Sequence, residues 1–204
     1  MRRKTVIVTG LIGSGKSAVC ALLRERGIPV YNSDERTKWL YDHRPALLDR
    51  LEEALGMPLR GDDGRLDRKA LAGRIFADAA ARETLEAIVY PVVLQDFKRW
   101  RARQKGARYV VLESAVILSK PLFDGLADAV VLVSAPEAVR LQRVRQRDNL
   151  PAEAVRARMS AQKIPLEKVD VELPNDGAPE ALPLAVDAVF FRKNSYICKI
   201  LEER

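Results

Sequence analysis

The sequence of 204 residues is 48% hydrophobic and 31% charged, a balance that supplies a core and a solvated surface for one domain with elaborations. Its apolar runs are shorter than the ~20 residues that cross a membrane, and glycines interrupt the short run behind the basic N-terminus, so we expect no signal peptide. The net charge of +7 comes without a long block of like charges or a nucleic-acid recognition signature, so small polyanionic metabolites explain it at least as well as nucleic acid does.

Strands and helices alternate along the chain. In chain order the predicted elements are strand 4–9, helix 16–26, strand 28–31, a helix starting at Ser33 or Asp34, helices 67–76 and 79–105, strands 109–112 and 129–133, helices 136–148 and 152–163, strand 169–173 and a C-terminal helix. The strands are continuous apolar runs, which are typical of a parallel sheet covered by helices on both faces. The sequence therefore predicts an α/β fold.

The predicted helices 67–76 and 79–105 are amphipathic. Apolar residues recur in them at three- and four-residue spacing, among them Phe76, Leu85, Ile88 and Val92. This spacing predicts that these side chains form the inner faces of the two helices.

The segment between the first strand and the first helix reads Gly-Leu-Ile-Gly-Ser-Gly-Lys-Ser and matches the P-loop pattern G-x-x-x-x-G-K-[ST] in full. Glycines allow backbone N–H groups to turn inward around phosphate oxygens, and the helix N-terminus adds its positive end. The residues expected to surround the phosphates are Gly10, Leu11, Ile12, Gly13, Ser14, Gly15, Lys16 and Ser17.

This motif predicts a nucleoside triphosphate as ligand, with Lys16 at the β- and γ-phosphates and the Ser17 hydroxyl as a ligand of Mg²⁺. The alternative is a glycine-rich turn that only links a strand to a helix. The strand-to-helix context and the Lys-Ser pair in register argue against that alternative. The motif by itself does not separate a kinase from a GTPase, an ATPase or a regulatory module.

Asp34 follows the second predicted strand, at the edge of the sheet where the carboxyl ends of parallel strands form a ligand crevice. A carboxylate in this place can accept the proton of a substrate hydroxyl during phosphoryl transfer. Asp is also a favoured N-cap for the helix that follows, and local sequence leaves both roles open.

The predicted helix 136–148 carries several arginines. Arg140, Arg143 and Arg147 are spaced three and four residues apart and share one face of that helix. Such a face is usually only solvated, but in a chain with a P-loop it favours an arginine-bearing lid that closes over the phosphates.

Together these motifs resemble the dephospho-CoA kinase family over nearly the whole chain. The family shows Thr-Gly-Gly-Ile-Gly-Ser-Gly-Lys-Ser at its P-loop, and Thr9 to Ser17 differs from this pattern only at Leu11. The other matching residues are Asp34, Leu66, Arg68, Leu71, Phe76, Leu85, Glu86, Ile88, Pro91, Arg143, Arg147, Asp148, Gln162, Asp170, Asn175 and Gly177.

The resemblance implies a P-loop kinase fold: a five-stranded parallel sheet flanked by helices, an acceptor-binding helical insert at about 61–105 and a lid at about 136–167. The core would then comprise about 1–60, 106–135 and 168–204. The implied reaction transfers the γ-phosphoryl group of ATP, with Mg²⁺, to the ribose 3′-hydroxyl of dephospho-CoA.

The resemblance also implies roles for single residues. Lys16, Asp34, Arg143 and Arg147 would be catalytic, with Asp34 as the base. Asn175 and Gly177 would lie near the adenine of ATP. On the acceptor side the implied residues are Asp34, Arg68, Tyr90 and Glu113, and the basic residues Arg65, Lys69 and Arg74 are further candidates for its pyrophosphate.

Three departures from the family pattern bear on the site. Asn32 replaces the first Asp of Asp-Ala-Asp, Tyr90 replaces His before Pro91, and Glu113-Ser114-Ala115-Val116-Ile117-Leu118 replaces the usual Pro-Leu-Leu segment after the third strand. Similar variants occur in one branch of the family. Glu113 follows a strand expected beside the P-loop strand, where it can hold Mg²⁺ through water or act as a structural acceptor.

Two other functions remain open from the sequence. One is a different small-molecule P-loop kinase, with a nucleoside monophosphate or a shikimate-like acceptor. The other is a homologue that binds ATP without transferring its phosphate. Cys20 and Cys198 are far apart and have no metal-binding spacing, so we expect a reduced, cytoplasmic location. We expect a monomer or a weak homo-oligomer, without nucleic-acid or membrane partners.

Overall fold

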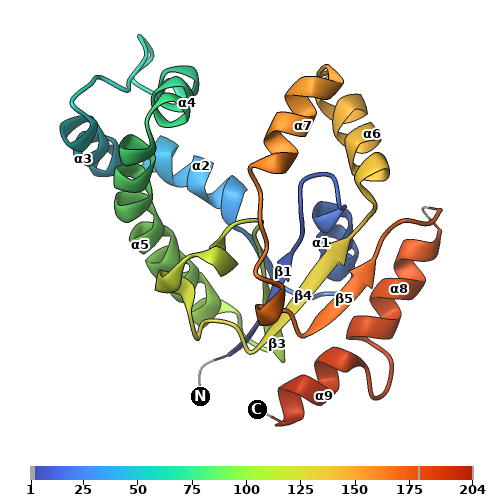
Figure 1. Cartoon of the computed structure of the whole chain (residues 1–204). Helices are drawn as coiled ribbons and strands as arrows, with labels where there is room; N and C mark the ends of the chain where they lie inside the picture. The colour runs from blue at the N-terminus through green and yellow to red at the C-terminus, as the bar shows by residue number, and fades with distance from the viewer. Residues whose placement is uncertain (1–2, 179, 204) are drawn as a thin grey trace. The chain divides into compact units, whose positions relative to one another are not determined.

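The structure is a computed structural model that describes residues 3–178 and 180–203. The chain forms two compact units (Figure 1). The first contains the residues up to Asn32 and those from Arg101 onward, and the second spans Ser33–Trp100. The second unit thus begins earlier in the chain than the helical insert predicted at 61–105.

The first unit is built on a parallel sheet in the order β2-β3-β1-β4-β5, which confirms the five-stranded parallel sheet. Its strands are β1 Lys4–Thr9, β2 Val30–Asn32, β3 Tyr109–Glu113, β4 Ala129–Ser134 and β5 Val171–Pro174. Strands β1, β3 and β4 consist mostly of β-branched or aliphatic residues, which favour a buried strand. Because the strands are parallel, their carboxyl ends meet at one edge of the sheet.

One face of this sheet carries the main core of the first unit. The helices around the sheet are α1 Lys16–Glu25, α6 Glu137–Asp148, α7 Ala152–Ser160, α8 Ala181–Phe190 and α9 Tyr196–Glu203. Helices α1, α8 and α9 bury their apolar sides against β1, β3 and β4 through side chains such as Leu23, Phe190 and Ile197. Helices α6 and α7 instead rise beyond the carboxyl end of β4 (Figure 1).

The short turns η1 Ile117–Ser119, η2 Pro121–Phe123 and η3 Leu166–Lys168 line the opposite face of the sheet in this unit. Together with Ile7 and Val130 they surround a cavity of about 270 Å³. Lys168 lies in the wall of this cavity and donates through Nζ to the Leu118 carbonyl at 3.0 Å and to Asp124 at 2.7 Å. This bridge ties the segment after β3 to the segment before β5.

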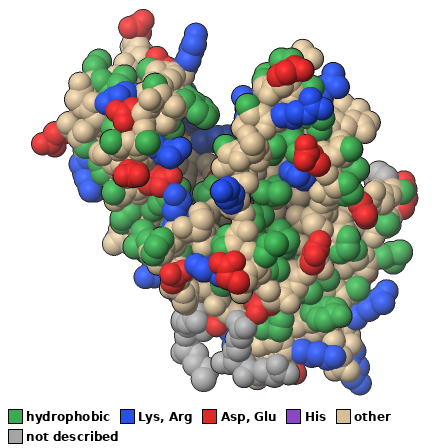
Figure 2. All heavy atoms as spheres, viewed as in Figure 1, with side chains coloured by type: hydrophobic (Ala, Val, Ile, Leu, Met, Phe, Trp, Pro, Cys, Tyr) green, Lys and Arg blue, Asp and Glu red, His purple; other side chains and the backbone are tan. Residues whose placement is uncertain are grey.

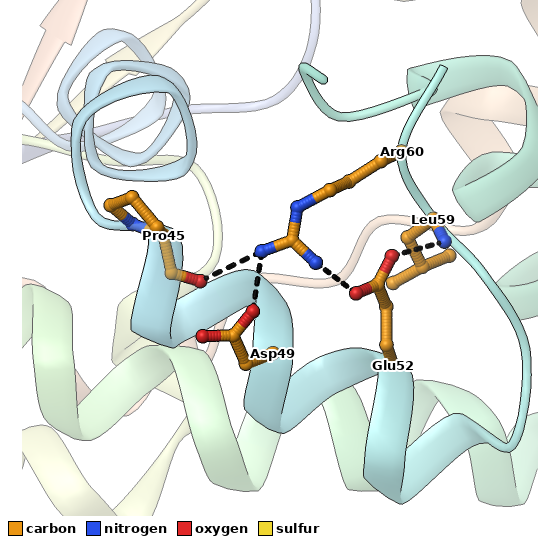
Figure 3. Close-up of polar contacts among 5 residues, drawn as sticks. All are labelled: Pro45, Asp49, Glu52, Leu59 and Arg60. Carbon is orange, nitrogen blue, oxygen red and sulfur yellow. Dashed lines mark hydrogen bonds and ion pairs between the residues drawn. The ribbon is translucent and has the colours of Figure 1, made fainter. Parts of the chain in front are cut away.

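The second unit is helical and contains α2 Ser33–His43, α3 Pro45–Leu55, α4 Arg68–Ala77 and most of α5 Ala79–Arg103. A polar cluster around Arg60 joins the loop before α4 to α3 (Figure 3). The guanidinium of Arg60 donates to Asp49 at 2.5 Å, to the Pro45 carbonyl at 3.2 Å and to Glu52. Glu52 also accepts the backbone N–H of Leu59 at 2.8 Å, so two successive residues of the loop are held by α3.

The buried side of α5 differs from the one predicted by periodicity. Leu85, Ile88 and Val92 are only half-buried, whereas the residue after Ile88, Val89, is fully buried. Of the apolar residues that follow the helical spacing in α4, Leu71 is buried as expected, but the Phe76 side chain is 85% exposed. Helical spacing alone predicted the helix correctly but placed its buried face on the wrong side, because apolar residues occupy more than one stripe of α5.

The visible surface carries both signs of charge. Lys and Arg side chains lie among Asp and Glu side chains and do not gather into one block on the face shown in Figure 2. Among the described residues, no helix combines the length and apolar character that a membrane span requires.

Candidate active site

The P-loop leaves β1 at Thr9 and enters α1 at Lys16. A tight turn within it is closed by the N–H of Ser14, which donates to the Leu11 carbonyl at 3.1 Å. The Lys16 ammonium folds back over the loop and donates to the carbonyl of Gly10 at 2.6 Å and to that of Leu11 at 3.3 Å. The lysine charge therefore lies at the start of the loop, beside the amides that a triphosphate would meet.

Two loop glycines are required by close packing. At Gly13 (φ +81°) a Cβ would lie 2.6 Å from the Arg140 backbone oxygen, and at Gly15 (φ +97°) it would lie 2.0 Å from Asn175 Nδ2. Gly15 is also the N-cap of α1 in the left-handed region. Helix α6 and the loop after β5 thus lie directly against the P-loop backbone.

Gly15→Ala is expected to lower the free energy of unfolding by more than the cost of placing an alanine in the left-handed conformation. The conformational penalty is about 1–2 kcal/mol, and displacement of Asn175 adds about 1–3 kcal/mol. Gly27→Ala is the matched control, because Gly27 has φ +77° but no atom within 4 Å of a built Cβ among the described residues. Chemical denaturation measures both free energies of unfolding, and equal losses for the two variants would contradict the close packing at Gly15.

Helices α6 and α7 contact the tip of the P-loop. Ile12 packs beside the buried cluster of Val144, Val155 and Met159, which joins α6 to α7. The Ile12 N–H donates to Gln162 Oε1 at 2.7 Å. Ile12 therefore joins the P-loop both to the α6–α7 cluster and to the segment that follows α7.

The loop after β5 and one lid arginine hold the other side of the P-loop. Asn175 Nδ2 donates to the Ser14 carbonyl at 2.8 Å. Arg143 Nη1 donates to the Asn175 carbonyl at 3.0 Å and to the Ser14 carbonyl at 3.5 Å. The predicted nucleotide residue Asn175 and the predicted catalytic residue Arg143 thus contact the P-loop. Gly177 lies two positions beyond Asn175 on the same loop.

The three arginines of the expected lid face have different surroundings. Arg140 is buried and donates through Nε to the Ala135 carbonyl at 3.1 Å, while its Nη1 is buried without a partner among the described residues. Arg147 is exposed and forms a two-pronged ion pair with Asp148, with contacts of 2.7 and 3.1 Å. Hydrogen bonding from the Arg147 guanidinium lowers the pKa of Asp148. Arg143 therefore differs from both, because its guanidinium contacts the P-loop directly.

Glu113, at the end of β3, receives hydrogen bonds from two sides. The Ser17 hydroxyl donates to Glu113 Oε1 at 2.8 Å, and Asn32 Nδ2 donates to Oε2 at 2.9 Å. The Arg24 guanidinium lies 3.9 Å from Oε2. Burial, together with the Glu113 charge, raises the pKa of the nearby Cys20 thiol, so that thiol stays protonated at neutral pH.

This arrangement fits a Mg²⁺ ion delivered with ATP. The Ser17 hydroxyl donates its only proton to Glu113, so its oxygen lone pairs remain available to a hard cation. Among residues 3–178 and 180–203, no three His, Cys, Asp or Glu side chains cluster as a metal site. A small number of protein ligands, supplemented by phosphates and water, is usual for Mg²⁺.

The acceptor-side predictions Asp34, Arg68 and Tyr90 fall in the second unit. Asp34 lies in the first turn of α2 and is exposed, and the helix starts at Ser33, one residue ahead of it. Tyr90 donates to Glu86 at 3.4 Å; burial raises the pKa of its phenol, and the charges of Glu86 and Asp34 raise it further. Arg68 pairs with Asp42 at 3.2 Å.

Sequence reasoning missed some residues of the site. The role of Asn32 toward Glu113 needs the register of β2 against β3, in which these two residues are partners. The contact from Gln162 to Ile12 and the burial of Arg140 need the fold of the lid. Of these, Gln162 had a sequence signal, as part of the lid pattern shared with the family.

A family model for dephospho-CoA kinase matches residues 4–177. A dephospho-CoA kinase from Porphyromonas gingivalis is 41% identical over 159 residues, which cover 78% of this chain and 77% of that protein. A dephospho-CoA kinase from Anaeromyxobacter dehalogenans is 36% identical over 184 residues, which cover 88% of this chain and 87% of that protein.

Solved structures agree with the sequence comparisons. A crystal structure of a Thermus thermophilus protein matches with a TM-score of 0.78 at 36% identity, over 93% of this chain and 97% of that one. A dephospho-CoA kinase from Campylobacter jejuni shares the fold, with a TM-score of 0.60 at 22% identity over 98% of each chain. With the complete P-loop and the match over 4–177, the conclusion is that the chain belongs to the dephospho-CoA kinase family.

Proposed function

We propose that the chain transfers the γ-phosphoryl group of ATP to the ribose 3′-hydroxyl of dephospho-CoA and releases ADP and coenzyme A. The observation that carries this proposal is a complete P-loop whose Ser17 hydroxyl donates to Glu113, in a chain of this family. Phosphoryl transfer needs little covalent chemistry from the protein, so positioning and charge are the tasks of its residues.

The P-loop residues bind the triphosphate. Backbone N–H groups from Gly13 to Ser17 and the N-terminus of α1 attract the phosphate oxygens. Lys16 exchanges its present loop carbonyls, those of Gly10 and Leu11, for the β- and γ-oxygens. Asn175 and Arg143 stabilise the conformation of the P-loop through their hydrogen bonds. The loop from Asn175 to Gly177, after β5, contacts the nucleoside end of ATP.

Ser17 would hold Mg²⁺, and Glu113 would support it as a nearby carboxylate acting through water. The ion, when bound with ATP, neutralises charge on the β- and γ-phosphates. Glu113 is 4% exposed, so its charge acts in a poorly solvated place where it is screened less than at the surface.

Asp34 would orient the acceptor hydroxyl and accept its proton. It follows Asn32 by two positions, just beyond the carboxyl end of β2. Tyr90, whose phenol keeps its proton, would act as a neutral hydrogen-bond donor on the acceptor side. Arg68 would meet the pyrophosphate of the acceptor and release Asp42 as it does so. The further basic candidates for that pyrophosphate are Arg65, Lys69 and Arg74.

Arg143 and Arg147 would stabilise charge that develops on the transferring phosphoryl group. Arg147→Ala is expected to lower kcat roughly 10- to 100-fold with little change in the Kd of ATP, because its exposed side chain pairs with Asp148 rather than with the P-loop. Arg145→Ala, an exposed arginine on the same helix, is the control. Steady-state kinetics measure the change in kcat, and ATP titration measures the change in Kd. If only the Kd of ATP changed, Arg147 would not stabilise charge on the transferring phosphoryl group.

A panel of acceptors tests the proposed function. ADP release with MgATP is followed for dephospho-CoA, nucleoside monophosphates and shikimate. The proposal expects kcat/KM for dephospho-CoA to exceed that for every other acceptor. Preference for another acceptor would favour a different small-molecule kinase, and ATP binding without acceptor-dependent turnover would favour the non-catalytic homologue.

A further inference from the structure

The side chains of Asn32 and Glu113 are neighbours because of strand register. Strands β2 and β3 are parallel, and Asn32 and Glu113 are paired positions at the carboxyl ends of both. Paired positions present their side chains on the same face of the sheet. The resulting hydrogen bond from Asn32 Nδ2 to Glu113 Oε2 is 2.9 Å long and involves a buried carboxylate.

Both oxygens of that carboxylate are engaged in a directed way. Oε2 accepts from Asn32, and Oε1 accepts from the hydroxyl of Ser17 at 2.8 Å. Each of the two bonds restricts the rotamer of Glu113, so each fixes the orientation that the other one uses. The amide of Asn32 therefore acts on Ser17 through Glu113.

We propose that Asn32 is a positioning residue for the Mg²⁺ of MgATP. Its N–H group holds Glu113 in the rotamer that takes the hydroxyl proton of Ser17, which leaves the lone pairs of Ser17 Oγ directed toward the cation. This inference rests on the proposed function, because it assumes that Ser17 meets Mg²⁺ there.

The identity of residue 32 matters because the hydrogen bond needs a proton between the two side chains. Asn32 stands where the resembled family pattern has Asp. A carboxylate in this place would face Glu113 with acceptors and no donor, and like charges at hydrogen-bond distance repel. The Arg24 guanidinium, at 3.9 Å and 42% exposed, provides little compensation for a second negative charge. The pair thus requires one amide and one carboxylate.

The requirement can be tested by exchanging the two groups. Asn32→Asp removes the donor and adds repulsion, and Asn32→Ala removes the donor without adding charge. In the double variant Asn32→Asp/Glu113→Gln, the amide introduced at position 113 would donate to the carboxylate introduced at position 32, while the carbonyl oxygen of that amide accepts from Ser17. The summed charge of the pair then equals that of the natural chain. Asn194→Asp adds the same charge as Asn32→Asp at an exposed position and is the control.

Calorimetric titration with ATP, in Mg²⁺ and separately in EDTA, provides a readout without turnover. The ratio of ATP affinity in Mg²⁺ to ATP affinity in EDTA measures the Mg²⁺-dependent gain. In Asn32→Asp and in Asn32→Ala this ratio is expected to be about tenfold smaller than in the natural chain, with the affinity in EDTA unchanged. The double variant is expected to regain most of that gain. The concentration of free Mg²⁺ that half-activates turnover should follow the same order, and Asn194→Asp should match the natural chain.

The proposal is overturned if Asn32→Ala keeps the full Mg²⁺-dependent gain, or if the double variant is no better than a folded Asn32→Asp. Equal losses in Mg²⁺ and in EDTA would also overturn it, since they would indicate only a structural role for the pair. Thermal melting shows whether each variant folds, and Asn32→Ala decides the matter if the charged variant does not. A natural chain that binds MgATP but fails to phosphorylate dephospho-CoA would instead refute the proposed function alone.

Discussion

Replacing Lys16 with Ala is expected to lower kcat with dephospho-CoA by about 10³-fold. The ammonium is the cation that the P-loop sequence places at the β- and γ-phosphates, where negative charge shifts during transfer. It donates to two carbonyls of its own loop, at 2.6 and 3.3 Å, and its side chain is not part of the buried core. The loss should therefore be in chemistry and phosphate binding rather than in stability.

Lys193→Ala provides the control for Lys16→Ala, because Lys193 is exposed and lies outside the helices. Steady-state kinetics measure kcat, and thermal melting measures stability. The melting temperature of Lys16→Ala should lie near that of the natural chain, while its turnover should fall by a large factor. If Lys16→Ala lost less than about tenfold in kcat, the assignment of the ammonium to the transferring phosphates would be wrong.

Asp34→Asn is expected to lower kcat by about 10²–10⁴-fold, the usual range for losing a positioned general base. The amide can still accept a hydrogen bond from the acceptor hydroxyl but cannot take its proton. Asp34 is exposed in the first turn of α2, so the substitution leaves the core in place. Binding of dephospho-CoA should change much less than turnover.

Glu35→Gln is a close control for Asp34→Asn. Both acidic residues lie in the first turn of α2, where each interacts favourably with the positive end of the helix. Loss of either charge should lower stability by a similar amount, about 0.3–1 kcal/mol. Near-normal turnover of Asp34→Asn, or an equal loss for both variants, would assign Asp34 to helix stability and not to catalysis.

Most of the sheet and the phosphate loop could be predicted from sequence because their signals are local. The apolar runs of β1, β3 and β4 are continuous, and the P-loop pattern fixes a strand before it and a helix after it. The turn at 61–64 is closed by a hydrogen bond from the Gly64 N–H to the Gly61 carbonyl, as its glycines indicate. The C-terminal helix predicted after the last strand is present, and a second helix, α9, follows it.

The polar network at the carboxyl ends of the strands could not be predicted in the same way. Glu113 and Ser17 are 96 residues apart, and their contact depends on the pairing of β3 with β1. Arg140, Arg143 and Arg147 share a helical face by spacing, but the fold buries the first and leaves the last exposed. Spacing describes one helix alone, whereas these environments depend on what the helix packs against.

Transfer of the γ-phosphoryl group of ATP to a single hydroxyl of dephospho-CoA can be followed on the product itself. ³¹P NMR of the product, with nucleotides separated after incubation of the chain with MgATP and dephospho-CoA, tests it most directly. ADP and coenzyme A are expected in equal amounts, with the new phosphomonoester on the ribose 3′-oxygen. ADP formed without a phosphorylated acceptor, or a phosphate on any other oxygen, would contradict it.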